Sequence, residues 1–209
     1  NGQVVAELAL GLLIAAFRRF AEAGAEGRRG RLMRPQGRSV FGSTIVVLGA
    51  GDLARHFLTR AEACGATVRL VGRVERDGVH GIGQVFELLD QADAVVATLP
   101  LTDETRGLVD ADFLAALRDG AVLVNVGRGA VVDAAALAAE VRSGRLRAAL
   151  DVTDPEPLPP DHEFWTLPNV IVTPHIGGAV RGAFERAYAV CLDQLAQFAR
   201  GEVPTNRVL

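Results

Sequence analysis

The chain has 209 residues, of which 49% are hydrophobic and only 5% aromatic, so it suits one large or two small domains with cores of alanine, valine and leucine. Its formal net charge is −3 and no basic run is interleaved with aromatic residues, which argues against nucleic acid as a partner. All 22 basic residues are arginine, which excludes a Schiff-base lysine and the lysine of a P-loop.

The most apolar stretch comes first, from Val4 to Phe17. It is too short for a membrane span, contains Glu7 and lacks a basic leader, so it predicts a buried helix and not a membrane or secretion segment. From Ala21 to Gly42, glycine, arginine and proline replace the hydrophobic pattern. Residues 21–43 are therefore predicted to be a linker or surface excursion.

Short apolar runs then alternate with helical patterns. Strands are predicted at Thr44–Leu48, Thr67–Val71, Ala94–Leu99, Ala121–Val126, Arg147–Val152 and Val170–Thr173. Helices are predicted at Leu53–Ala63, Val85–Gln91, Ala111–Leu117 and Ala134–Val141, the last two capped by Asp110 and Asp133, and a final helix at about Ala179–Ala199. Runs that are apolar on both faces indicate a parallel sheet covered on two sides, a doubly wound Rossmann-type α/β fold over residues 44–180, followed by a helix and tail over 181–209.

The segment Gly49-Ala-Gly-Asp-Leu-Ala54 forms the turn between the first predicted strand and its helix. Gly49 permits a tight turn, Gly51 lets backbone amides approach a phosphate, and Ala54 is small where helix meets strand. We therefore predict that Gly49, Gly51, Asp52 and Leu53 bind a dinucleotide. A glycine-rich turn in a nucleotide-free fold remains the alternative, because Ala54 replaces the usual third glycine.

The end of the second predicted strand indicates which dinucleotide is bound. An NAD-binding chain usually has an acid there for the adenosine ribose, whereas this chain has Gly72 followed by Arg73 and Arg76. Two guanidinium groups could bind the 2′-phosphate of NADP, so NADP is preferred and NAD remains possible. The alternative is a pair of solvated arginines, with Glu75 as a weak substitute for the acid.

Three later segments each place one reactive side chain at the end of a predicted strand. They are Asn125-Val-Gly-Arg-Gly129, Leu150-Asp-Val-Thr-Asp-Pro-Glu-Pro157 and Thr173-Pro-His-Ile-Gly-Gly178. The candidate active-site residues in these segments are Arg128, Glu156 and His175. A guanidinium matches a carboxylate in bidentate fashion, and a carboxylate beside an imidazole orients the ring and favours its protonated form. Beside a nicotinamide, this trio suggests hydride transfer on a carboxylic acid.

Structural roles for the same residues remain open. Arg128 could pair with a nearby acid, His175 could cap or pack, and Glu156 could lie in a solvated proline-rich loop. Asp154 is the alternative partner for the histidine. His56, His80 and His162 show no metal-ligand spacing, so no metal site is predicted. Cys64 and Cys191 have no CxxC spacing, which fits a reducing cytoplasm.

With these motifs in this order, nearly the whole chain resembles the cofactor-binding part of the D-isomer-specific 2-hydroxyacid dehydrogenases. It is most similar to glyoxylate and hydroxypyruvate reductases that use NADPH. The resemblance implies that Arg128 holds the substrate carboxylate, His175 is the acid/base and Glu156 assists it. It also implies that Asp151 lies near the nicotinamide amide and that the cofactor is lined by Leu99, Pro100, Thr105, Val126, Gly127 and Gly178.

Members of this family carry an amino-terminal substrate domain before the point that matches Asn1, and that domain is absent here. We expect a fragment of a longer enzyme, the alternative being an autonomous binding module. The resemblance implies that the helix over residues 1–20 crosses between domains and joins a dimer interface. A homodimer acting on a small 2-keto or D-2-hydroxy acid is expected.

Two other functions remain open. One is an NAD(H)-sensing, corepressor-like binding protein, since that branch resembles the enzymes even in the trio. The other is a phosphoglycerate dehydrogenase-like enzyme. Formate dehydrogenases resemble this fold but carry glutamine where Glu156 stands, which disfavours formate as the substrate.

Overall fold

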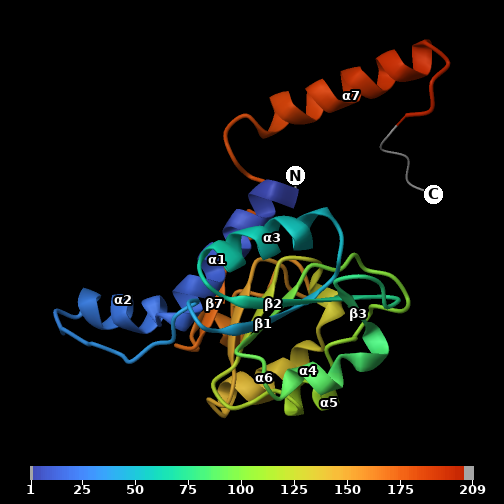
Figure 1. Cartoon of the computed structure of the whole chain (residues 1–209). Coiled ribbons are helices and arrows are strands. Elements are labelled where there is room, and N and C mark those ends of the chain that lie inside the picture. Colours follow the sequence, from blue (N-terminus) through green and yellow to red (C-terminus); the bar gives the residue numbers. More distant parts are fainter. Residues whose placement is uncertain (1, 205–209) are drawn as a thin grey trace.

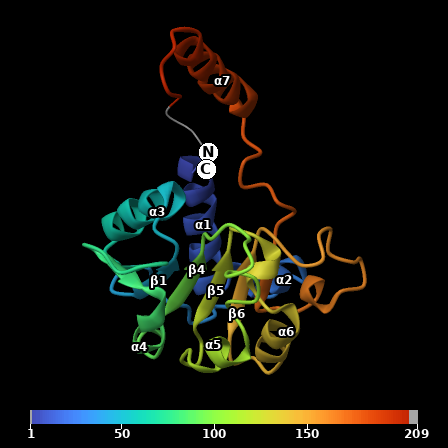
Figure 2. The same ribbon diagram turned by 90° about the vertical axis from the view of Figure 1, so that its right-hand side faces the viewer.

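Seven strands form one sheet in the order β3-β2-β1-β4-β5-β6-β7, and every neighbouring pair is parallel. Figure 2 shows β1, β4, β5 and β6 side by side in this sheet. The strands are β1 Thr44–Leu48, β2 Thr67–Gly72, β3 Val79–Gly81, β4 Ala94–Ala97, β5 Val122–Asn125, β6 Arg147–Leu150 and β7 Val170–Val172. The computed structural model describes residues 2–204. Residues 1 and 205–209, which the predicted ranges 1–20 and 181–209 include, lie outside the described residues.

Helices cover both faces of the sheet (Figures 1 and 2). Helices α1 (Gly2–Phe17) and α3 (Asp52–Ala63) pack on one face, whereas α4 (Phe86–Leu89), α5 (Ala111–Ala115) and α6 (Ala134–Arg142) pack on the other. Strand β1 is apolar on both faces. Ile45 and Val47 pack in the core under α1 and α3, Val46 and Leu48 pack in the core under α4, α5 and α6, and all four are fully buried. The doubly wound fold predicted from the sequence is confirmed.

Most element positions also agree with the sequence. All six predicted strands are present, and the side chains of Asp110 and Asp133 accept hydrogen bonds from first-turn amides of α5 and α6. Strand β3 was not predicted, because three residues that include Gly81 are too short to show a period. The 3₁₀ segments Ile82–Gln84, Gly129–Val131 and Glu163–Trp165 were likewise not predicted.

Two helices extend from the body of the molecule (Figure 1). Helix α2 (Phe20–Arg28) lies, apart from its first residue, in the segment 21–43 that was predicted to be a linker or surface excursion. The segment was not predicted as a helix because its glycines interrupt the alanine- and glutamate-rich pattern. Helix α7 (Ala183–Ala199) begins later than predicted because Gly182 has φ 76°, and it has no buried residue. Among the described residues, no helix is both long and apolar enough to cross a bilayer. Both cysteines are free and exposed.

Candidate active site

The strand order reverses between β1 and β4, so the crevice of this sheet lies at their carboxyl ends. Gly49 has φ 123°, and a Cβ there would collide with Oγ1 of Thr98, so the turn after β1 requires glycine. Gly51 caps α3 without a side-chain hydrogen bond, and the space beside it is open. The first helical residues are Asp52 and Leu53, and no side chain caps the first-turn amides, which are the groups that bind anions at a helix amino terminus.

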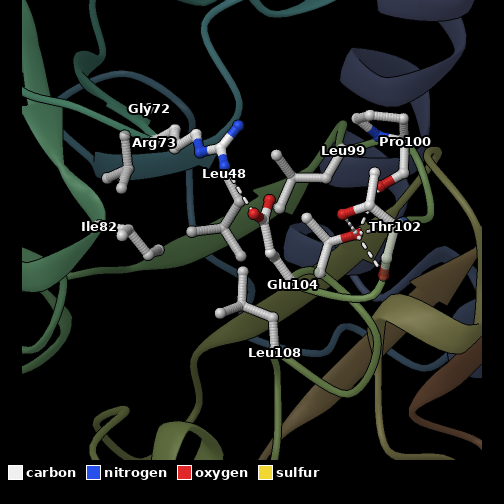
Figure 3. A pocket seen from close by; sticks show the side chains of 11 residues that line it. Leu48, Gly72, Arg73, Ile82, Leu99, Pro100, Thr102, Glu104 and Leu108 are labelled. Carbon is white, nitrogen blue, oxygen red and sulfur yellow. Dashed lines mark hydrogen bonds and ion pairs between the residues drawn. The ribbon is translucent and has the colours of Figure 1, made fainter.

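A cavity of about 270 Å³ lies beside this turn (Figure 3). Four predicted cofactor residues line it, namely Arg73, Leu99, Pro100 and Thr105. Gly72, which the sequence placed at the ribose position, also lines the cavity. The remaining lining residues were not predicted, and they are Leu48, Val71, Ile82, Thr102, Glu104 and Leu108. Most of these walls are apolar, as a purine ring requires. Arg76 is not a lining residue, and its backbone pairs with Val79 in the turn before β3.

The turn after β5 is held by Asn125, which is buried. Its Nδ2 donates to the carbonyl oxygen of Arg128 at 3.0 Å, and its Oδ1 accepts from the amide of Gly127 at 3.1 Å. A Cβ on Gly127 would lie 2.6 Å from the carbonyl oxygen of Leu99, so this turn packs directly on the end of β4. Val126, between Asn125 and Gly127 in the sequence, is buried. The side chain of Arg128 is exposed, and its Nη1 donates to the Gly127 carbonyl at 2.7 Å.

Gly129 connects this turn to the loop that carries Glu156. A Cβ at Gly129 would collide with the backbone of Thr153, three residues before that glutamate. The two loops therefore touch through their backbones. This contact fixes the Arg128 turn against the loop after β6.

Asp151 builds the turn after β7. It is 2% exposed, and its carboxylate accepts hydrogen bonds from Thr173 Oγ1 at 2.5 Å and from the amides of Ile176 and Gly177, both at 2.9 Å. Its carbonyl oxygen accepts from the amide of His175 at 2.8 Å. The backbone of His175 has φ 54°, a conformation that non-glycine residues adopt only where the surroundings impose it. The sequence did not reveal this supporting role of Asp151.

His175 and Glu156 come together, as predicted: Nδ1 and Oε1 are 2.6 Å apart. Asp154 is not the bonded partner. The histidine side chain is 49% exposed and the glutamate 41%, beside a cavity of about 240 Å³ that also includes Asp151, Leu158, Trp165 and Thr173. The carboxylate occupies Nδ1, and Nε2 forms no hydrogen bond among the described residues.

No hydrogen bond or ion pair joins Arg128 to this pair. It follows β5 at the same edge of the sheet, two strands from β7, which is a distance of about 10 Å between strands. Gly178 lies in the turn after His175, where its carbonyl accepts from Val180 at 3.0 Å. Among the described residues, no group of three His, Cys, Asp or Glu side chains could hold a metal.

The comparisons with known proteins identify the family. The model of the NAD binding domain of the D-isomer specific 2-hydroxyacid dehydrogenases matches residues 10–177. The chain belongs to this family. Its part in the family is the domain that binds the nicotinamide cofactor, as the glycine turn and the crevice indicate.

Individual relatives agree with this assignment. The chain is 34% identical to D-3-phosphoglycerate dehydrogenase of Methanocaldococcus jannaschii, covering 98% of the chain and 40% of that protein. It is 34% identical to glyoxylate reductase of Aeropyrum pernix, covering 99% of the chain and 66% of that protein. The dehydrogenase domain thus spans less than two thirds of either relative.

A solved structure of the family matches closely. The D-isomer specific 2-hydroxyacid dehydrogenase of Xanthobacter autotrophicus Py2, in complex with NADPH and MES, superimposes with a TM-score of 0.88 at 34% identity. The match covers 100% of this chain and 88% of that one.

Proposed function

We propose that the complete protein reduces a small 2-keto acid, such as glyoxylate or hydroxypyruvate, to the D-2-hydroxy acid with NADPH. The observation that carries this proposal is the bond between His175 and Glu156, 2.6 Å long, beside a cavity at the carboxyl ends of β6 and β7 in a cofactor-binding domain. The glyoxylate reductase relative and the NADPH in the solved relative support the same reaction.

The residues present fit a dinucleotide. The turn from Gly49 to Gly51 and the amides that open α3 would hold its pyrophosphate, and the cavity beside Arg73 would take its adenosine end. Leu99, Pro100 and Thr105 would line it from β4 and its loop. When bound, the cofactor supplies the hydride.

The chain's own residues supply binding and proton transfer. Arg128 binds the substrate carboxylate through its planar guanidinium and thereby orients the keto carbon. His175 donates a proton from Nε2 to the keto oxygen and, as an imidazolium, stabilises the charge that develops there. Glu156 bonds to Nδ1 and holds the ring in place. In the reverse direction, neutral His175 accepts the proton.

The test is oxidation of NADPH by the complete polypeptide, followed by its absorbance, with glyoxylate and hydroxypyruvate as substrates. Turnover with either acid is the expected result. Tight binding of NADPH without turnover of any 2-keto acid would overturn the proposal and favour the cofactor-sensing protein.

A phosphoglycerate dehydrogenase is the second candidate, because one relative of that name is 40% identical to the chain over 196 residues. Reduction of NAD by the complete protein with D-3-phosphoglycerate, at a rate above NADPH oxidation with glyoxylate, would favour it.

We also propose a cytoplasmic homodimer. The expectation rests on the family resemblance and on the two free cysteines, which fit a reducing compartment. Light scattering of the complete protein should give twice the monomer mass, and a monomer would refute the dimer.

A further inference from the structure

An ion pair spans the adenosine-end cavity, although its partners are 31 residues apart. Nη2 of Arg73, directly after β2, lies 2.5 Å from Oε1 of Glu104, in the loop after β4 (Figure 3). Both residues line the cavity. The carboxylate of Glu104 therefore bonds to the same guanidinium that we propose binds the 2′-phosphate of NADP.

The backbone on both sides of the pair is held in place. Oγ1 of Thr105 donates to the Pro100 carbonyl at 2.7 Å and accepts from the amide of Thr102 at 2.8 Å, which fixes the loop beside Glu104. Across the cavity, a Cβ on Gly72 would lie 3.0 Å from a methyl group of Val79, so the end of β2 packs closely on β3. The two charged groups thus face each other from fixed backbones.

The pair itself is free to open. The Arg73 side chain is 78% exposed and that of Glu104 is 62% exposed. An exposed ion pair of this kind contributes little to stability, so a ligand that offers Arg73 a stronger anion can displace the carboxylate.

We infer that Glu104 determines how strongly the protein prefers NADP over NAD. The inference rests on the cofactor part of the proposed function. Glu104 competes with the 2′-phosphate for Arg73 and repels it as a like charge, so the carboxylate weakens the binding of NADP. Towards NAD the same carboxylate is an acceptor for ribose hydroxyl groups. From the loop after β4, it replaces the acidic residue that NAD-binding chains usually have at the end of the second strand, where this chain has Gly72.

The experiment measures dissociation constants of NADPH and NADH, by cofactor fluorescence, for the complete protein and its Glu104→Gln, Arg73→Gln and doubly substituted variants. We expect Glu104→Gln to raise the preference for NADPH by about two- to fivefold at low salt. The effect should decline at high salt, where exposed charges are screened. Arg73→Gln should lower the preference, and Glu104→Gln should have a smaller effect when Arg73 is already replaced.

Glu163→Gln provides the matched control. Glu163 forms an ion pair of the same length with Arg142, at 2.5 Å, away from the cavity, and its loss should leave the preference unchanged. If Glu104→Gln leaves or lowers the preference while Arg73→Gln reduces it, the inference is overturned but the NADP assignment stands. If Arg73→Gln leaves the preference unchanged, the cofactor part of the proposed function fails instead.

Discussion

Charged residues lie at both ends of the parallel strands, but their surroundings differ. The side of the sheet where the strands begin is called the amino edge here, and the side where they end the carboxyl edge. At the amino edge, Glu22 of α2 is 8% exposed, and its Oε1 accepts from Arg147 Nη2 at 2.5 Å and from Arg19 Nε at 3.0 Å. Its Oε2 is buried without a hydrogen-bond partner among the described residues. Arg147 begins β6 and also donates to the Ala16 carbonyl in the last turn of α1, so this cluster joins three elements.

Asp93, directly before β4, repeats the arrangement. It is 5% exposed, both Arg38 and Arg118 bond to its Oδ1, and its Oδ2 accepts from the amide of Thr44 at 2.7 Å. Each buried carboxylate at this edge therefore has two guanidinium partners. Removing one partner leaves a buried charge poorly compensated, which is costly.

The carboxyl edge has the opposite arrangement. Glu156 and His175 are about half exposed and lie beside a cavity. In the described part of the chain, each has the other as its only side-chain hydrogen-bond partner. Charges enclosed on several sides thus hold the fold together, whereas a pair open to a cavity is available for chemistry.

The largest effect on stability should come from the amino edge. Arg147→Met leaves Glu22 with one guanidinium and should lower the free energy of unfolding by about 3 kcal/mol. Turnover by the folded protein should not change. Urea unfolding measures the loss, and Arg142→Met, which breaks an exposed pair, should cost less than about 1 kcal/mol. Equal losses in the two variants would contradict the comparison.

At the carboxyl edge, Glu156→Gln should reduce turnover and leave stability intact. Loss of a positioned acid costs about 10²–10⁴-fold in rate, and loss of the group that positions it should cost less than that. Steady-state kinetics should show a lower kcat with little change in KM for the keto acid. Asp154→Asn, in the same loop, is the control and should keep the full rate. An unchanged kcat in Glu156→Gln would remove the glutamate from the mechanism.

The smallest effect is a pH dependence at the amino edge. Burial raises the pKa of Glu22, but hydrogen bonds from Arg147 and Arg19 lower it by more, so the pKa in the folded protein lies below its ordinary value of 4.5. A lowered pKa contributes stability above the ordinary value that is lost as the pH falls through the folded one. The stability difference between the wild type and Glu22→Gln should therefore stay constant above about pH 5.5 and shrink as the pH falls below 4.5. A difference in urea unfolding that does not shrink at these lower pH values would refute the assignment.

Much of the fold could be predicted because its determinants are local. Runs such as Ile45 to Leu48 are apolar on both faces, which indicates a buried parallel strand without knowledge of its neighbours. Strand β3 could not be predicted, because its three residues are defined by backbone pairing with β2. Helix α2 could not be predicted because it is held in part by the hydrogen bond that Arg147 donates to Glu22, two residues that are 125 positions apart.

The candidate site divides in the same way. His175 and Glu156 follow strands in recognisable segments, so their pairing could be expected. The part that Asp151 plays depends on amides 25 and 26 residues later and has no sequence signal. Glu104 could not be nominated either, because only the neighbouring positions of β2, β1 and β4 in the sheet bring its loop to Arg73.

Replacement of His175 by alanine in the complete protein tests the central claim most directly, with turnover of NADPH and a 2-keto acid, the dissociation constant of NADPH and the unfolding temperature measured together. His80→Ala, on edge strand β3, is the histidine control. We expect a loss of about 10²–10⁴-fold in turnover for His175→Ala only, with cofactor binding and stability unchanged. Full turnover without the His175 imidazole would refute its role as the acid/base.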